Sequence, residues 1–247
     1  MLPIVAKNLK LTRNGVPILN DLSVQISDQT GVTAIMGFNG AGKSILMRVL
    51  NGLIKFDSGT LLWDGEECHP EVLSRKQTLV LQKPVMLRRS VEENIKYGFR
   101  KSLNSSSRYD RLLELLELSK VAHLAKRPAR DISAGEQQRV AIARALAFDP
   151  RLIYFDEPTS SLDPISAQII ENVIISASKD GKKIVLVTHS LPQVRRLAGD
   201  VIFIDRGRVA EHRSTAEFFQ APSSEAGRAF MEGMEFSKED KKESASV

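Results

Sequence analysis

Cysteine is almost missing from this sequence: Cys68 is the only one among 247 residues. A lone thiol cannot form a disulfide within the chain, and it cannot build a metal site that needs several cysteines. Long apolar runs are missing too, since none approaches the roughly 18 residues of a membrane-spanning helix. The first residues, from Met1 to Lys7, lack the basic start and long apolar core of a signal peptide. We therefore expect a cytosolic protein.

A strong excess of one charge is also absent. Lys and Arg number 35 against 30 Asp and Glu, and the net charge of +5 is spread along the chain rather than massed in one segment. A solvated surface explains so small an excess better than a nucleic-acid partner does, and we expect no such partner. The hydrophobic fraction of 42% is enough for a sizeable buried core in one large or two small domains.

The sequence does contain a phosphate-binding loop. Residues 37–44 read GFNGAGKS and fit the pattern G-x-x-x-x-G-K-[ST] at every fixed position. An apolar run, Val32–Met36, precedes the loop and predicts a buried strand, while Ile45–Leu50 predicts the opening of a helix. Glycines let backbone N–H groups curl around a phosphate, and the helix N-terminus adds partial positive charge. Lys43 is expected to reach the β- and γ-phosphates, and the Ser44 hydroxyl to bind Mg²⁺.

Two kinds of strand pattern predict an α/β fold. Short strands with turns fill residues 1–31, where Asn14-Gly15 is a hairpin signal, and residues 60–65 end in an Asp-Gly turn. These segments predict a small antiparallel sheet. Apolar strands that alternate with helical patterns predict a mostly parallel sheet as well. The apolar strands cover residues 32–36, 77–82, 152–155, 184–188 and 201–204, and a turn at 205–207 leads to a last strand at 208–210.

A mostly helical insert is expected between these strands, at about residues 84–135. Its pattern predicts a helix start at residues 91–95, an exposed serine-containing loop at 101–108, and a leucine-rich helix that runs to about Leu124. The predicted organisation is a phosphate-loop NTPase core at residues 1–83 and 136–236, the insert between them, and a charged, disordered tail at 237–247.

Two carboxylates follow a buried strand after the insert. Four apolar residues, Leu152–Phe155, deliver Asp156 and Glu157 to the carboxyl end of the strand, which is the edge where ligands bind in open α/β sheets. Asp156 suits the Mg²⁺ side of a phosphate site, and Glu157 suits a general base that polarises the attacking water. Either carboxylate alone could be a solvated strand end, but the phosphate loop in the same chain favours the functional interpretation.

The motifs of this chain, taken in order, resemble those of the ATP-binding subunit of ABC transporters. The resemblance covers about residues 5–220. It rests on the phosphate loop, Gln82, residues 133–139 (SAGEQQR), Asp156-Glu157, residues 161–163 (SLD) and His189. It implies that one copy cannot complete its own site, so that two copies pair head-to-tail around a two-fold axis and enclose two ATP molecules.

The resemblance assigns roles to individual residues. It implies that Ser133 and Gly135, at a helix N-terminus, contact the γ-phosphate of the ATP bound by the second copy, and that Asp163 helps to form the dimer contact. It implies that His189 hydrogen-bonds the γ-phosphate, and that Gln82 touches Mg²⁺ and links nucleotide state to rotation of the insert. The expected catalytic residues are Glu157, His189, Lys43 and Gln82. The expected nucleotide-binding residues are Arg13, Gly37, Asn39, Gly40, Ala41, Gly42, Lys43, Ser44, Ile45, Ser133, Gly135 and Glu136. The expected Mg²⁺ ligands are Ser44, Gln82 and Asp156.

The sequence departs from the family pattern in four places. Arg13 stands where the family has an adenine-stacking aromatic residue, although a guanidinium plane can also stack on a base. In residues 133–139, which correspond to the family's signature segment, Ala134 and Glu136 replace the commonest glycine and glutamine. Ile45 replaces a threonine after the phosphate loop, and Ser190 stands where an aspartate is frequent. None of these changes removes a catalytic group.

The resemblance also implies partners. Because the sequence has no membrane span, separate transmembrane permease subunits are expected, and a solute-binding protein completes an importer. The protein is then expected at the cytoplasmic side of the inner membrane, as a peripheral subunit. In the family, a short helix of the membrane subunit docks in a groove beside the loop that corresponds to Gln82. In this chain the groove is expected to be lined by Lys83, Pro84, Val85, Met86 and Leu87. Alternatively, these apolar residues pack the insert's own core.

The transported solute has a weaker signature. Residues 216–222 and 229–233 are similar to the C-terminal ends of tungstate-type and related oxyanion importers, which favours tungstate or molybdate. Phosphate and polar amino-acid importers have comparable ends. A different class stays open, a soluble ABC ATPase of iron–sulfur cluster assembly, whose partner would be a soluble scaffold protein rather than a membrane subunit.

Overall fold

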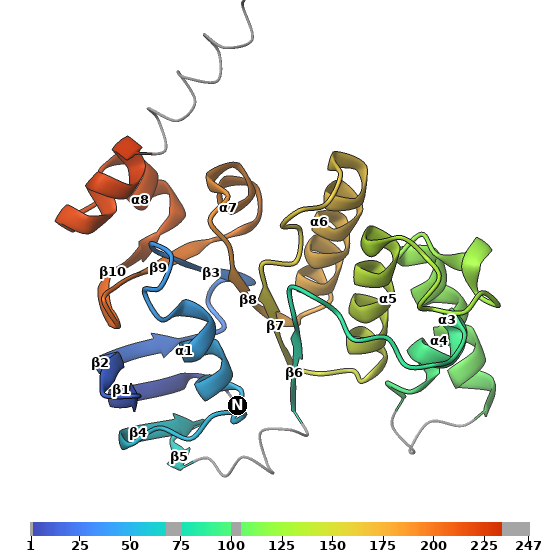
Figure 1. Ribbon diagram of the computed structural model, residues 1–247, viewed down its shortest axis with the longest axis horizontal. Coiled ribbons are helices and arrows are strands. Elements are labelled where there is room, and N and C mark those ends of the chain that lie inside the picture. The colour runs from blue at the N-terminus through green and yellow to red at the C-terminus, as the bar shows by residue number, and fades with distance from the viewer. Residues whose placement is uncertain (1, 68–75, 100–104, 234–247) are drawn as a thin grey trace, which may run out of the picture. The chain divides into compact units, whose positions relative to one another are not determined.

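A computed structural model describes residues 2–67, 76–99 and 105–233. Cys68 and the tail at residues 237–247, which is expected to be disordered, lie outside these ranges. The chain divides into two compact units (Figure 1): unit 1 is built from residues 1–68 and 189–247, and unit 2 from residues 69–188. In the three described ranges, no helix combines the length and the apolar character that crossing a bilayer requires.

Unit 1 contains an antiparallel sheet with the strand order β2-β1-β4-β5 (Figure 1). Its strands are β1 (Ile4–Arg13), β2 (Val16–Ile26), β4 (Ser58–Trp63) and β5 (Glu66–Glu67). The predicted hairpin between β1 and β2 is confirmed. Asn14 and Gly15 both have positive φ, 51° and 76°, as the tight turns that join twisted antiparallel strands require.

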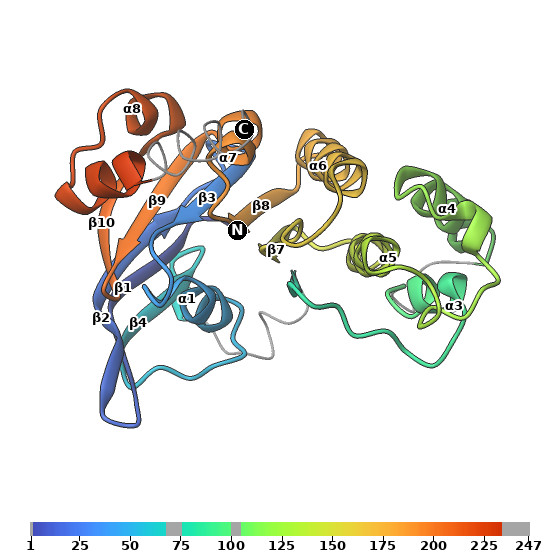
Figure 2. The ribbon, with the colours of Figure 1, turned by 45° about the horizontal axis from the view of Figure 1, so that its top comes forward.

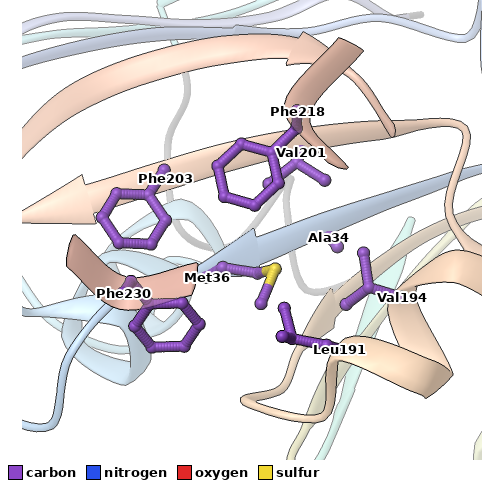
Figure 3. Packing of buried hydrophobic residues seen from close by; sticks show 8 residues of the cluster. All are labelled: Ala34, Met36, Leu191, Val194, Val201, Phe203, Phe218 and Phe230. Atoms are coloured by element: carbon purple, nitrogen blue, oxygen red, sulfur yellow. The ribbon is translucent and has the colours of Figure 1, made fainter. Parts of the chain in front are cut away.

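A second group of strands in unit 1 carries the phosphate loop. Strand β3 (Val32–Met36) runs parallel to β9 (Asp200–Asp205), which pairs antiparallel with β10 (Arg208–Ser214). All five residues of β3 are buried, as is typical of a parallel strand covered on both faces. The helices of unit 1 are α1 (Lys43–Leu50), α7 (Leu191–Leu197), α8 (Thr215–Gln220) and an unlabelled helix at residues 225–233. An apolar cluster joins β3 and β9 to α7, α8 and the helix at residues 225–233 (Figure 3).

Unit 2 contains three parallel strands in the order β8-β7-β6. They are β6 (Gln77–Val80), β7 (Leu152–Asp156) and β8 (Lys183–Val187). Among the described residues, the helices of unit 2 are α3 (Val91–Lys96), α4 (Ser105–Leu118), the short 3₁₀ helix η1 (Ala122–Leu124), α5 (Ala134–Ala147) and α6 (Pro164–Lys179). Helices α3 and α4 pack on α5 (Figure 2). Parallel strands, alternating helices and the small antiparallel sheet confirm the predicted α/β class.

Two boundaries of α4 differ from the sequence prediction. Residues 105–108 are helical rather than part of an exposed loop, and serine is a favourable residue at a helix start; residues 101–104 of the predicted loop lie outside the described ranges. The helix was expected to run to about Leu124 but ends at Leu118, because Lys120 is left-handed with φ 54°. The N–H of Val121 then donates to the carbonyl oxygen of Leu116 at 2.9 Å and closes the helix.

Candidate functional site

The phosphate loop joins β3 to α1 in unit 1, and its glycines adopt conformations that other residues avoid. Gly37, Gly40 and Gly42 have φ of 142°, 80° and 101°. A Cβ on Gly37 would overlap the carbonyl oxygen of Ile204 in β9, and one on Gly42 would lie 2.9 Å from the carbonyl oxygen of Ile18 in β2. Glycine is therefore needed at both ends of the loop, because the backbone there contacts two neighbouring strands directly.

Helix α1 begins without a side-chain cap. Its N-cap is Gly42, which has no side chain that could accept a hydrogen bond, and its first turn contains no acidic residue. The first backbone N–H groups of a helix have no partner within the helix, and they carry the positive end of the helix dipole. The start of α1 is thus suited to bind an anion such as a phosphate.

Lys43 places a positive charge at the same point. Its side chain is only 6% exposed, and its ammonium donates hydrogen bonds to the carbonyl oxygens of Gly37 at 2.9 Å and Phe38 at 2.8 Å. These bonds fold the lysine back over the loop. A buried cation needs compensating partners, and the loop carbonyls supply two of them.

The other expected site residues of unit 1 lie in the loop, at the start of α1, at the end of β1 and just before α7. Asn39 and Gly40 are exposed, and Ser44 and Ile45 are partly buried at the start of α1. Arg13 is the exposed last residue of β1, paired with Val16 across the hairpin. His189 is exposed and directly precedes Ser190, the N-cap of α7, whose hydroxyl accepts from the N–H of Gln193 at 3.4 Å. Ser190 therefore caps this helix, as an aspartate could also do.

In unit 2, Gln82 and Glu157 come together at the carboxyl ends of parallel strands. The Nε2 atom of Gln82 donates to Glu157 Oε2 at 3.4 Å and to Ser160 Oγ at 2.9 Å. Asp156 is the buried last residue of β7, and Glu157 leaves the strand with a positive φ of 47° while its N–H donates to the carbonyl oxygen of Val187. Sequence reasoning missed Ser160; its place three residues after Glu157 was the available signal.

Helix α5 begins with a capping box. The Ser133 hydroxyl accepts from the N–H of Glu136 at 3.4 Å, and the Glu136 carboxylate accepts from the N–H and the hydroxyl of Ser133, each at 2.8 Å. Burial raises the pKa of Glu136, but these hydrogen bonds outweigh burial and leave the pKa of this carboxyl below its ordinary value. The signature serine and Glu136 are therefore engaged with each other.

Gly135 packs against the start of α6, and Asp163 caps that helix. A Cβ on Gly135 would lie 2.5 Å from Ser166 Oγ, and that oxygen also accepts from Arg139 Nη1 at 3.0 Å. Asp163 is the N-cap of α6 and accepts from the N–H of Ser166 at 2.8 Å. Hydrogen bonds from Ser166 hold the pKa of Asp163 below its ordinary value. Both residues thus contribute to the packing of their own unit.

A partly apolar groove also lies in unit 2. Its volume is about 430 Å³. Its lining residues are Thr78, Leu79, Val80, Leu81, Pro84, Val85, Tyr97, Gly98, Ala141, Arg144, Ala145 and Phe148. Val85 and Tyr97 are each 66% exposed, whereas Met86 is buried and packs the interior of the unit. Arg144 holds the segment around Val85 in place. Its guanidinium donates to the carbonyl oxygen of Val85 at 2.9 Å and to Asn94 Oδ1 at 3.2 Å.

The expected Mg²⁺ ligands are side chains with oxygen donors. The described residues contain no group of three or more His, Cys, Asp or Glu side chains that could hold a metal ion. Mg²⁺ does not require such a group, because it is usually bound through one or two carboxylates together with waters and substrate phosphates. Ser44, Gln82 and Asp156 offer a hydroxyl, an amide and a carboxylate, whose oxygens are of the kind that Mg²⁺ prefers. Each of these residues, taken by itself, therefore supplies a donor of a type that suits Mg²⁺.

Comparisons with known proteins add independent findings. A family model described as ABC transporter matches residues 19–160. A tungstate uptake system ATP-binding protein from Peptoclostridium acidaminophilum is 36% identical over 210 residues, which cover 84% of this chain and 97% of that protein. A phosphate import ATP-binding protein from Pyrobaculum aerophilum is 34% identical over 249 residues, with 94% and 99% coverage.

A solved structure agrees with these relatives. The dimeric post-hydrolysis state of the ATP-binding cassette MJ0796, bound to ADP and Pi, superimposes with a TM-score of 0.76 at 26% identity. The match covers 86% of this chain and 98% of that one. The two relatives and this structure therefore match over almost their whole lengths.

Proposed function

Because this chain belongs to the ABC transporter family of ATP-binding proteins, we propose that it is the ATPase subunit of an importer, that two copies act as a pair, and that membrane subunits dock on unit 2. The observation that carries the proposal is the start of α1, where an uncapped helix end and the buried ammonium of Lys43 meet in one loop. A triphosphate is the ligand that such a loop suits, and the family makes it ATP.

Hydrolysis is proposed to depend on Glu157 as the general base that polarises the attacking water. The hydrogen bond from Gln82 supports this role, since it orients the carboxylate. Ser44 and Asp156 are the proposed protein ligands of Mg²⁺ with Gln82, and the bound ion would offset negative charge on the phosphates. His189 is proposed to hydrogen-bond the γ-phosphate, for which its exposed position leaves it accessible.

A second copy is proposed to bring the start of its α5 to the γ-phosphate. Ser133 and Gly135 lie at the N-terminus of that helix, where backbone donors and the helix dipole favour an anion. The dimeric relative bound to ADP and Pi supports this arrangement by analogy. In such a pair, each copy would supply the phosphate loop of one site and the signature helix of the other.

The groove of unit 2 is the proposed docking place for a short helix of a membrane subunit. Val85 and Tyr97 present apolar surface there, and exposed apolar surface of this kind is typical of a binding site for a partner. The groove is lined by Leu81 and Pro84, which lie on either side of Gln82 in the sequence, so a docked helix would sense the segment that carries this glutamine. This arrangement would place the protein as a peripheral subunit at the cytoplasmic face of a membrane.

The proposed solute is a small oxyanion, such as tungstate, molybdate or phosphate. The support is the naming of two relatives, a tungstate uptake protein and a phosphate import protein. The ATPase subunit does not itself contact the solute, so the solute-binding protein of the system is the place to measure this preference.

The test is an affinity purification of the Glu157→Gln variant with ATP, from detergent-solubilised cells that naturally express the chain. This variant should keep ATP affinity within a few-fold and lose hydrolysis by about 100-fold or more, because a positioned general base contributes about that much. A polytopic membrane protein should copurify. Adding Val85→Asp should abolish that capture, whereas Tyr109→Asp, an equally exposed change on α4, should not.

Three outcomes would contradict the proposal or a part of it. Full turnover in Glu157→Gln would remove this residue as the base. Capture of soluble scaffold proteins without any membrane protein would replace transport by the iron–sulfur assembly alternative. A copurified solute-binding protein that prefers a polar amino acid would keep the importer and reject the oxyanion.

A further inference from the structure

Four phenylalanines meet in unit 1 beside the phosphate loop. Phe203 of β9 and Phe218 of α8 are fully buried, and Phe230 of the helix at residues 225–233 is 6% exposed. Figure 3 shows these three rings around Met36. The fourth is Phe38, from the loop itself. Its ring meets Phe230 edge-on at 5.3 Å and 76°, and Phe203 at 6.3 Å and 86°.

Phe38 is directly linked to the lysine of the loop. Its carbonyl oxygen accepts a hydrogen bond from Lys43 Nζ at 2.8 Å, and the carbonyl oxygen of its neighbour Gly37 accepts a second one at 2.9 Å. Between Gly37 and Gly42, Phe38 is the only large apolar side chain. The Phe38 ring therefore belongs to one of the two residues whose carbonyl oxygens hold the ammonium.

The helix at residues 225–233 is itself fastened to β10. Glu211, a buried carboxylate, accepts from the N–H and hydroxyl of Ser223 at 2.8 and 2.9 Å and from those of Ser224 at 3.2 and 2.5 Å. Burial raises the pKa of Glu211, but these four donors outweigh it and leave the pKa below the ordinary value. A Cβ on Gly227 would overlap Glu211 Oε1. The start of the helix is thus held closely against the strand.

Phe230 makes its contact beside a largely open space. A cavity of about 730 Å³ is lined by Asn39 and Gly40 of the loop and by Glu225 and Ala229 of the helix. Phe38 lines this cavity too and is 42% exposed. The contact between Phe230 and Phe38 therefore lies at the edge of this cavity, where it joins the loop to the helix at residues 225–233.

We infer that the helix at residues 225–233 positions the phosphate loop, with Phe230 acting through Phe38 on the carbonyls that hold Lys43. Phe230 is then a positioning residue for nucleotide binding, located almost two hundred residues from the loop it supports. This inference rests on the proposed binding of ATP. It predicts that losing the ring of Phe230 weakens ATP binding more than it slows turnover at saturating ATP.

The experiment measures the ATP dissociation constant of the full chain by calorimetry, together with the thermal midpoint and the steady-state ATPase rate. Phe230→Ala should raise the dissociation constant about three- to tenfold, the range that one aromatic pair supplies, with a saturated rate within about twofold. Phe230→Leu should recover part of the affinity. Phe38→Ala with Phe230→Ala should bind about as weakly as either alone, because both changes break one contact.

Phe219→Ala is the matched control. Phe219 contacts Phe218 at 5.8 Å and lies 4.4 Å beneath the guanidinium of Arg195. Its removal should lower the thermal midpoint while leaving the dissociation constant within twofold. Wild-type affinity in Phe230→Ala, or effects of the two phenylalanines that simply multiply, would overturn the inference while the proposed function stands. Absence of ATP binding in the wild-type chain would overturn both.

Discussion

Helices α1 and α5 begin in opposite ways. The first begins at Gly42, in a conformation that glycine adopts readily, and no side chain caps it. The second begins at Ser133, which forms a reciprocal capping box with Glu136. Both helix ends carry the same partial positive charge, so capping is where they differ.

The start of α1 therefore has no side chain that competes with an anion for its backbone N–H groups, whereas the start of α5 is already hydrogen-bonded to its own side chains. At α1, a phosphate can take backbone N–H groups without displacing a side chain. At α5, a γ-phosphate must share Ser133 with Glu136, and the nearby carboxylate repels it. We therefore expect ATP to bind first to the phosphate loop of its own copy, and the second copy to join afterwards.

The largest expected effect comes from capping α1. Gly42→Ser adds a hydroxyl at the N-cap and places a Cβ 2.9 Å from the carbonyl oxygen of Ile18, at φ 101°. The empty loop should relax out of this conformation, and regaining it on binding would cost about 1–3 kcal/mol, so the ATP dissociation constant should rise about 5- to 150-fold. Gly40→Ala is the control for backbone strain, since Gly40 also has a positive φ, 80°, but its Cβ would enter open space. Calorimetry that finds equal losses for both variants would contradict the importance of the closed contact.

A smaller effect is expected at the start of α5, and it concerns stability. Gly135→Ala would force its Cβ to 2.5 Å from Ser166 Oγ, and overpacking of this kind costs about 1–3 kcal/mol. Chemical denaturation should show that loss, and Ser166→Ala in the same chain should restore part of it. The neighbouring Ala134→Gly should cost at most about 1 kcal/mol. If Gly135→Ala unfolds at the wild-type denaturant concentration, α6 does not constrain this glycine.

The smallest effect concerns the charge of Glu136. Glu136→Gln should lower stability at pH 7 by at most about 1 kcal/mol, while ATP-dependent pairing strengthens about threefold as the repulsion disappears. The folded pKa of Glu136 lies below its ordinary value of 4.5, so the ionised cap stabilises above that pH. The advantage of the wild-type carboxylate should therefore fade as the pH falls below about 4.5. Weaker pairing in Glu136→Gln would show that the carboxylate assists the phosphate contact.

Local patterns predicted the elements that carry phosphate chemistry. The phosphate loop has fixed spacing, so Lys43 and Ser44 could be placed at a helix start from sequence alone. The carboxylates Asp156 and Glu157 follow an apolar strand, and the end of β7 lies there. The extent of α4 could not be predicted, because its end depends on one left-handed residue, Lys120, that no pattern marks.

Contacts between distant segments could not be predicted from such patterns. The bond from Arg144 to Val85 and the ring contact between Phe38 and Phe230 join residues whose spacing along the chain carries no signal. Ser160 was missed because its bond to Gln82 depends on how the backbone turns after Glu157. Packing decides these contacts, whereas periodicity and spacing indicate where most helices, strands and loops lie.

The most direct measurement is analytical ultracentrifugation of the Glu157→Gln chain without nucleotide, with ADP and with ATP. The account predicts monomers in the first two conditions and a dimer only with ATP, because only ATP has the γ-phosphate that is proposed to contact the start of α5 in a second copy. Lys43→Ala in the same background should remain monomeric. A chain that binds ATP with ordinary affinity and yet stays monomeric at saturating ATP would contradict the paired site.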